Sequence, residues 1–220
     1  MASLVRVIED QASQRPDSLA CVVGTERRSY AELAGEVLRF ASALRRLGLK
    51  AGDRLSLYLP NCVEYVPCFY GAMRAGLIAN PINVAFTRAE VTYLLKDCDA
   101  AGIVSTPELL SKLGFTPDGP SPRVVISTGE AAPPWHSLAS LLAEPAGPVP
   151  LPPEDSPACL PYSSGTTGRS KGITHTHDSL AMQAVLSANH LQFRPYDVLV
   201  QALPLAVSYT HLTLPTILLV

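Results

Sequence analysis

Apolar residues recur along the chain with two different spacings, and each spacing predicts a different element. After Ser29 they return every three or four positions as far as Leu47, which is typical of a helix with one apolar face. Ser29 and Glu32 form a capping box at the expected start of this helix, and Gly48 provides its expected end. The pattern therefore predicts a long amphipathic helix that packs one side against a core.

Short apolar runs between the helical segments predict buried strands. A second helix is expected over residues 61–75, and a third opens at the capping box formed by Thr87 and Glu90. Because strands and helices alternate, the sequence predicts fold class α/β, a layered βα domain with a largely parallel sheet. The expected strands cover residues 17–23, 53–59, 77–81, 101–104 and 123–127.

Prolines change the pattern in the middle of the chain. Residues 129–157 contain a dense series of prolines, which keep a chain extended and interrupt helices. This stretch is expected to be an internal linker with one short helix over residues 135–142. It leads into a strand at 159–162, and a β-branched strand is expected at 173–177 with a helix starting at Asp178.

Composition excludes several function classes. A net charge of −2 provides no basic field for nucleic acid. The five cysteines are widely spaced without a Cys-x-x-Cys pair, so neither a disulfide framework nor a zinc site is expected, and most should be buried thiols. Residues 198–220 are long enough to cross a bilayer, but their prolines and polar residues make a poor spanning helix. Since residues 1–10 carry charges that a signal peptide would lack, a cytoplasmic location is expected.

The candidate chemistry lies in residues 162–172, a run of small hydroxyl residues and glycines that includes Lys171. Glycine allows backbone N–H groups to approach an anion, hydroxyls add short hydrogen bonds, and a lysine adds a mobile positive charge. The expected ligand is a nucleotide polyphosphate. The P-loop of NTPases does not fit, because that motif needs Gly-Lys-Ser/Thr before a helix, whereas here Gly172 follows the lysine and a strand is expected. An ordinary turn is the other interpretation, and the length of the run and its Lys-Gly end argue against it.

The run resembles the phosphate-binding signature of the AMP-forming adenylating enzymes, which include acyl-CoA synthetases and peptide-synthetase adenylation domains. Residues 163–168 and 171–172 match this signature, with Ser170 where the family usually has proline. Three further segments resemble the family: Thr176-His177, residues 74–83, and the Leu-Pro-Leu step at 203–205. The resemblance implies ATP-dependent activation of a carboxylic acid, expected to be a fatty acid, to an acyl-adenylate and then to acyl-CoA. It also implies ATP, Mg²⁺ and coenzyme A. The residues implied to bind ATP are Ser163, Ser164, Gly165, Thr166, Thr167, Gly168, Lys171 and Gly172.

The resemblance covers residues 1–206, interpreted as part of an AMP-binding domain. The catalytic lysine of the family's C-terminal domain is not among them, so the 220-residue chain alone is expected to be an inactive fragment. Residues 207–220 resemble a reading frame through a sequencing adapter and are expected to be a non-native tail, so His211 is not taken as catalytic. A stand-alone nucleotide-binding or inert fragment, and a peptide-synthetase adenylation domain, remain as alternatives. Tyr65, Phe69 and Tyr70 could line an acyl pocket, but their helical spacing favours plain core.

Overall fold

The computed structural model describes residues 4–116, 122–163, 170–194, 197–201, 203–206 and 217–219. Within these residues no helix is both long enough and apolar enough to cross a membrane. The helices are α1 (Leu4–Gln14), α2 (Tyr30–Arg46), α3 (Tyr65–Arg74), α4 (Arg88–Asp97), α5 (Pro107–Leu113), α6 (Leu138–Ala143) and α7 (His177–His190).

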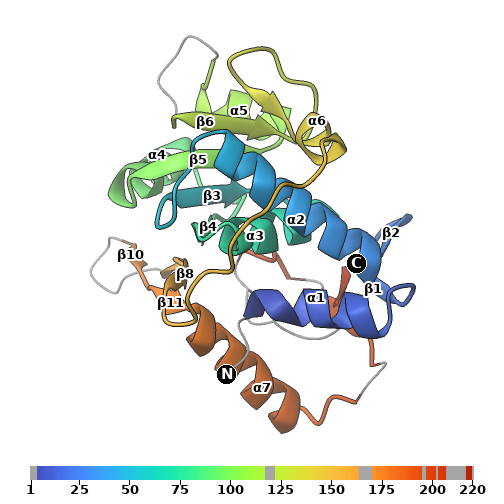
Figure 1. Cartoon of the computed structure of the whole chain (residues 1–220). Helices are drawn as coiled ribbons and strands as arrows, with labels where there is room; N and C mark the ends of the chain where they lie inside the picture. The colour runs from blue at the N-terminus through green and yellow to red at the C-terminus, as the bar shows by residue number, and fades with distance from the viewer. Residues whose placement is uncertain are drawn as a thin grey trace.

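A seven-stranded sheet forms the centre of the molecule, in the order β11-β8-β4-β3-β5-β6-β7 (Figure 1). Its described strand pairs are parallel except that β11 runs antiparallel to β8. The predicted α/β fold with a largely parallel sheet is therefore confirmed. The strands are β3 (Arg54–Tyr58), β4 (Ile78–Pro81), β5 (Ala100–Ser105), β6 (Val124–Ser127), β7 (His136–Ser137), β8 (Pro157–Cys159) and β11 (His175–Thr176).

The two faces of this sheet bury two separate cores. Leu55 and Leu57 of β3 belong to a large core with α1, α2 and α3, whereas Tyr58 belongs to a smaller core with α4 and α5. Successive side chains of a strand point to opposite faces, so one apolar strand supplies both cores. Figure 1 shows α2 crossing one face of the sheet. The result is a layered α/β/α arrangement.

Local capping explains where the predicted helices begin. The Ser29 hydroxyl accepts a hydrogen bond from the Glu32 N–H, and the Glu32 carboxylate accepts one from the Ser29 N–H. The same reciprocal pair joins Thr87 and Glu90 at α4. Both predicted capping boxes are confirmed. Helices α1 and α5 are not among the elements predicted from the sequence.

The start of α3 differs from the prediction. The helix begins at Tyr65 and not at Asn61, and no side chain caps it. The Asn61 side chain is engaged elsewhere, because its amide N–H donates to the Leu203 carbonyl at 3.0 Å and its carbonyl accepts from the Leu205 N–H at 2.8 Å. A long-range contact has therefore replaced the local cap. It ties the predicted Leu-Pro-Leu step to the start of the α3 region.

A second sheet has the order β12-β13-β1-β2. Residues 217–219 form β13 and pair in parallel with both β1 and β12. The non-native origin of residues 207–220 stays a prediction. The strands are β1 (Leu19–Val23), β2 (Glu26–Ser29), β12 (Leu199–Gln201) and β13 (Ile217–Leu219).

The proline-rich stretch packs against the domain. Within residues 129–157 the structure forms β7 and α6, so the expected short helix is present but begins three residues later, at Leu138. The guanidinium of Arg74 donates to the carbonyl oxygens of Val149 at 2.7 Å and Pro150 at 3.1 Å. An extended proline-rich chain has no internal hydrogen bonds for its backbone carbonyls, so the buried Arg74 side chain donates hydrogen bonds to two of them.

Aromatic and thiol side chains mostly serve as core. Tyr65, Phe69 and Tyr70 are buried in the large core, so the core interpretation of these aromatic residues is confirmed. The cysteines of the described chain are free thiols, four of them buried and Cys62 half-buried. Burial raises the pKa of Cys21 to about 11 and that of Cys159 to about 12, so these thiols stay protonated at neutral pH.

Candidate phosphate-binding site

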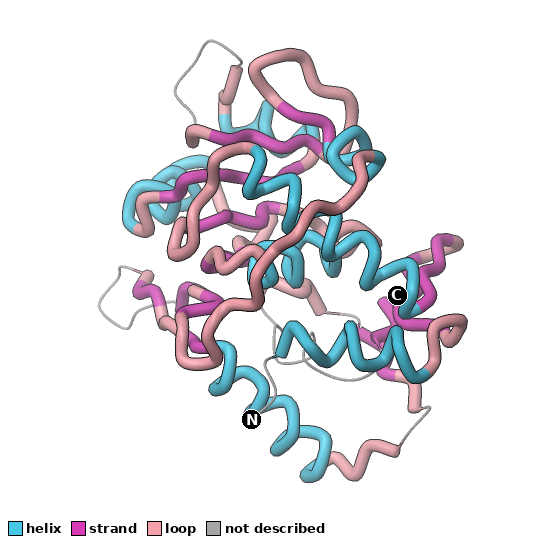
Figure 2. The backbone as a smooth tube through the Cα atoms, viewed as in Figure 1, coloured by secondary structure: helices cyan, strands magenta, loops and turns pink. Residues whose placement is uncertain are grey.

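The candidate loop is built on a short β-hairpin. Strand β9 (Tyr162–Ser163) pairs antiparallel with β10 (Lys171–Gly172), and Ser163 lies directly opposite Lys171. Strands lie on both sides of residues 164–169, as predicted, but the second begins at Lys171, within the run that was expected to be loop, and residues 164–169 themselves lie outside the described residues. Pro161 separates β9 from β8, so the strand expected over 159–162 is divided between two sheets. Figure 2 shows these short strands in magenta beside the start of α7.

The structure places only part of the predicted site. Ser163, Lys171 and Gly172 are described, and all three are exposed at the hairpin. The other predicted ATP-binding residues lie outside the described residues: Ser164, Gly165, Thr166, Thr167 and Gly168. The register brings the first serine and the lysine of the signature together across the two strands.

Close packing explains why position 172 is glycine. A Cβ added to Gly172 would lie 3.0 Å from Leu160 Cδ1 and 3.3 Å from Tyr162 Cζ. Both distances are shorter than an ordinary van der Waals contact between carbons. The absent side chain therefore allows the Tyr162 ring to lie against the opposite strand of the hairpin.

Tyr162 ties the hairpin to helix α4. Its hydroxyl donates a hydrogen bond of 2.6 Å to Asp97 Oδ2 at the last residue of that helix. Burial, together with the hydrogen bond to the Asp97 carboxylate, raises the pKa of Tyr162 above its usual range. The phenol therefore remains a donor at every physiological pH.

A second tyrosine of α4 reaches the same carboxylate. The Tyr93 hydroxyl lies 3.3 Å from Asp97 Oδ1 and 3.4 Å from the Ser170 carbonyl, so its single proton is shared between the two acceptors. Beside these groups is an open cleft of about 660 Å³, lined by residues of α4, by Phe86 and by Ser170. The hairpin thus sits at the border of a hollow on the α4 surface.

The Thr-His step begins α7. Thr176 caps the helix, since its hydroxyl accepts from the Ser179 N–H at 3.3 Å and also donates to the Asp178 carboxylate. The latter bond lowers the pKa of Asp178.

His177 is fully buried, and within the described chain neither ring nitrogen has a hydrogen-bond partner. Burial lowers the pKa of His177 to about 4, although the nearby Asp178 opposes the shift. The β-branched strand expected over 173–177 is shorter, because His177 already belongs to the helix.

The described residues fit a polyphosphate better than a metal ion. An exposed lysine opposite an exposed serine can bind phosphate oxygens. No group of three His, Cys, Asp or Glu residues that could hold a cation is found in the part of the chain that the structure describes. No described residue is therefore assigned to Mg²⁺.

Sequence reasoning missed the contribution of α4. Tyr93 and Asp97 are four positions apart on a predicted helix, so their shared face could have been read from the spacing. Nothing in the sequence indicates that Tyr162, 65 positions after Asp97, meets the same carboxylate. Only the fold brings these residues together.

Comparisons with known proteins identify relatives of this chain. The AMP-binding enzyme family matches residues 8–220. A 4-hydroxybenzoate–CoA/benzoate–CoA ligase of Rhodopseudomonas palustris is 33% identical over 90% of this chain and 37% of its own length. A long-chain-fatty-acid–CoA ligase of Mycobacterium tuberculosis is 33% identical over 81% of the chain and 35% of its own length. The chain therefore spans about a third of the length of these relatives.

Solved structures share the fold. The apo structure of MbtA from Mycobacterium smegmatis superimposes with a TM-score of 0.86 at 30% identity, covering 99% of this chain and 43% of the other. An inhibitor-bound N-terminal domain of FACL13 from Mycobacterium tuberculosis gives 0.83 at 27% identity, covering 100% of this chain and 57% of the other.

Proposed function

Because the chain belongs to the AMP-binding enzyme family, we propose that it contains the phosphate-binding part of an ATP-dependent acid–CoA ligase. The ligase activates a carboxylic acid as an acyl-adenylate with release of pyrophosphate. The acyl group then passes to coenzyme A with release of AMP. Relatives named as CoA ligases support this reaction, and they extend well beyond the length of this chain.

The observation that carries the proposal is the β9–β10 hairpin, where Ser163 lies opposite Lys171 and both side chains are exposed. A hairpin that ends in a Gly/Ser/Thr-rich sequence can surround the β- and γ-phosphates of ATP. Its lysine would reduce the charge repulsion between these phosphates and the attacking carboxylate. Nucleotidyl transfer depends largely on positioning and charge neutralisation, so this loop would act by holding the leaving pyrophosphate.

Each residue of the signature has a defined role in this proposal. Gly165, Gly168 and Gly172 keep the backbone close to the anion. Mg²⁺ would accompany ATP as a counter-ion without a ligand from the described residues. The hydroxyls that would bind phosphate oxygens belong to Ser163, Ser164, Thr166 and Thr167.

The acid is proposed to be a fatty acid, with an aromatic acid as the second candidate. The aromatic candidate is favoured by relatives named for benzoate and for salicylate, the latter 34% identical over 89% of this chain. A panel of carboxylic acids in an ATP–pyrophosphate exchange assay distinguishes the two. The fatty-acid assignment fails if benzoate or salicylate supports faster exchange than palmitate.

The 220 residues alone are proposed to bind ATP without completing the reaction, since the relatives are about two and a half times as long. A stand-alone nucleotide-binding role, or a peptide-synthetase adenylation domain, remains the alternative. The buried free thiols fit a reducing compartment, and a cytoplasmic location is part of the proposal.

The direct test is calorimetric titration of the chain with ATP. We expect Lys171→Ala to weaken binding about tenfold, because the charge-assisted contact with phosphate is lost. Lys50→Ala removes an exposed lysine in the turn before β3 and is the control for the loss of charge. Equal affinities for the two variants would contradict the proposed role of the hairpin.

A further inference from the structure

The β9–β10 hairpin is small and exposed, so the pairing between its two strands does not fix its orientation relative to the rest of the domain. Two residues on each strand are paired, and Ser163 and both residues of β10 are exposed. A two-stranded hairpin of this size is not stable alone in water. Contacts with a neighbouring element must therefore hold it.

Helix α4 supplies these contacts at two points. The Asp97 carboxylate accepts a hydrogen bond from Tyr162 of β9 at 2.6 Å. The Tyr93 hydroxyl, one turn earlier on the helix, lies 3.4 Å from the carbonyl of Ser170, next to β10. Asp97 Oδ1 and the Ser170 carbonyl compete for the single Tyr93 proton, whereas Asp97 Oδ2 has the Tyr162 proton to itself, so the direct link between the Asp97 carboxylate and the hairpin is the Tyr162 hydrogen bond.

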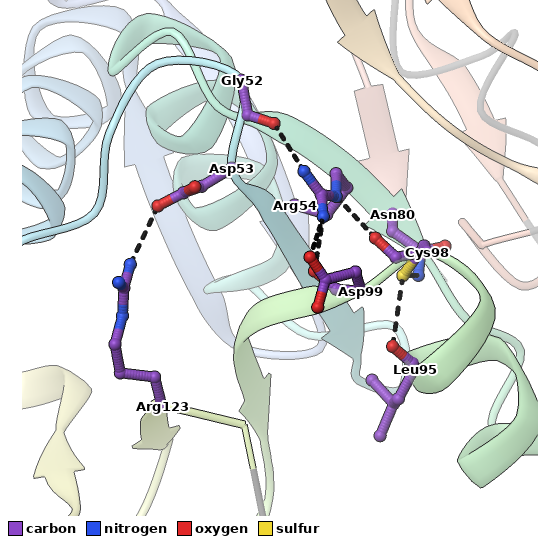
Figure 3. A network of polar contacts seen from close by, with 8 residues as sticks. All are labelled: Gly52, Asp53, Arg54, Asn80, Leu95, Cys98, Asp99 and Arg123. Atoms are coloured by element: carbon purple, nitrogen blue, oxygen red, sulfur yellow. Dashed lines mark hydrogen bonds and ion pairs between the residues drawn. The ribbon is translucent and has the colours of Figure 1, made fainter.

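The end of α4 that carries Asp97 is itself fixed to the central sheet (Figure 3). Arg54 of β3 donates to the backbone carbonyls of Cys98 and Asp99, which follow the helix, and to the Asp99 carboxylate at 2.8 Å. A cation that binds the last carbonyls of a helix also interacts favourably with the helix dipole. The sheet, Arg54, α4 and Asp97 thus form a continuous support for the hairpin.

We propose that Asp97 is a positioning residue, which holds the phosphate-binding hairpin against α4 through the hydrogen bond that it accepts from Tyr162. The inference rests on the proposed function of the hairpin. Asp97 touches no substrate atom in this role. Its carboxylate fixes the direction in which Ser163 and Lys171 leave the domain, and so reduces the entropy lost when these two residues bind a polyphosphate.

Two variants test the proposal. Asp97→Ala removes both acceptor oxygens, and Tyr162→Phe removes only the hydroxyl that reaches Asp97. Asp10→Ala is the matched control, because it removes an exposed carboxylate on α1, outside the support formed by the sheet, Arg54, α4 and Asp97.

Hydrogen exchange separates positioning from general stability. The Ile173 N–H donates to the Pro161 carbonyl at 2.9 Å at the base of the hairpin, whereas the Leu160 N–H donates to Ala79 at 2.8 Å in the central sheet. We expect Asp97→Ala and Tyr162→Phe to speed exchange at Ile173 about tenfold while Leu160 stays protected. ATP affinity should fall about threefold to tenfold, the effect of losing one hydrogen bond. The double variant, Asp97→Ala with Tyr162→Phe, should bind ATP no more weakly than Asp97→Ala alone, because both changes remove the same hydrogen bond.

Each result decides the proposal. Unchanged exchange at Ile173 in both variants would overturn it, as would faster exchange with unchanged ATP affinity. Equal loss of protection at Ile173 and Leu160 would also overturn it, because the role would then be general stability. If the parent chain binds no ATP, the proposed function fails, and exchange at Ile173 still decides whether Asp97 positions the hairpin.

Discussion

At the scale of single residues, Arg74 connects three distant segments. Its guanidinium binds Glu9 of α1 at 2.8 Å and the carbonyls of Val149 and Pro150 in the proline-rich stretch, and the residue is buried. Replacing Arg74 with methionine keeps much of its volume and leaves these carbonyls without a donor. We expect the free energy of unfolding to fall by about 2–4 kcal/mol in urea denaturation.

A second arginine provides the control for this change. Arg46 pairs with Glu144 at 2.8 Å, but both side chains are substantially exposed. Exposed ion pairs contribute little because water screens them and the side chains lose entropy. Arg46→Met should therefore cost less than about 1 kcal/mol. Equal losses for the two variants would show that the buried contacts of Arg74 are not what stabilises the packed proline-rich stretch.

The buried His177 should make the stability of the protein depend on pH. Its pKa falls from 6.5 to about 4 in the folded protein, so the unfolded state binds more protons between these values. The contribution of the neutral His177 imidazole to the free energy of unfolding is fully present above pH 6.5, and it is lost as the pH falls toward 4. Relative to His177→Leu, the parent should lose about 2 kcal/mol between pH 7 and 4.5 in urea titrations. Parallel pH profiles for the two proteins would contradict the burial of a neutral imidazole.

Residue-level prediction from the sequence worked where the partners are close in the chain. The capping pairs Ser29/Glu32 and Thr87/Glu90 depend on a spacing of three, which the sequence displays directly. The contact between Asp97 and Tyr162 depends on the path of the chain through the sheet. Such a pair cannot be predicted without the fold.

At the scale of elements, the hairpin depends on Gly172. We expect Gly172→Ala to push the Tyr162 ring away, since the new methyl group would approach Tyr162 Cζ to 3.3 Å and Leu160 Cδ1 to 3.0 Å. The Tyr162 bond to Asp97 should weaken, and the Ile173 amide should exchange several times faster. Gly147→Ala is the control, because its added Cβ would meet the Ser42 hydroxyl at 3.2 Å, away from the hairpin. Unchanged exchange at Ile173 in Gly172→Ala would contradict this account of the glycine.

The predicted ends of helices and strands differ from the observed ends where a long-range contact replaces a local one. Most predicted strands appear within one or two residues of their expected ends, because each is an apolar run between breakers. Helix α3 was predicted to begin at Asn61 but begins at Tyr65, because the Asn61 side chain forms hydrogen bonds with the backbone of Leu203 and Leu205. A polar side chain with two competing uses cannot be assigned from its neighbours in the sequence alone.

At the scale of the whole molecule, α7 leaves an apolar face uncovered. Met182, Val185 and Leu186 share one side of the helix and are 41%, 56% and 60% exposed. Apolar patches of this kind favour association. We expect the 220-residue chain to self-associate at micromolar concentration in sedimentation velocity, and Leu186→Lys to shift it toward monomer.

Ser111→Lys places the same charge on an exposed polar position of α5, away from this face of α7, and should change association less. A parent chain that stays monomeric, or an equal effect of the two lysine variants, would contradict a role for this apolar face. The parallel sheet could be predicted from the alternation of elements, whereas this exposed face could not, because burial depends on which elements surround α7.

The most direct test of the central claim is to locate where the chain binds a polyphosphate. Tripolyphosphate titrated into isotope-labelled protein should shift the backbone amide signals of Ser163, Ser170, Lys171 and Gly172, with smaller changes in the sheet. Lys171→Ala should reduce these shifts without moving their position. Shifts that cluster elsewhere, or none at millimolar ligand, would contradict the assignment of the β9–β10 hairpin as the phosphate-binding element.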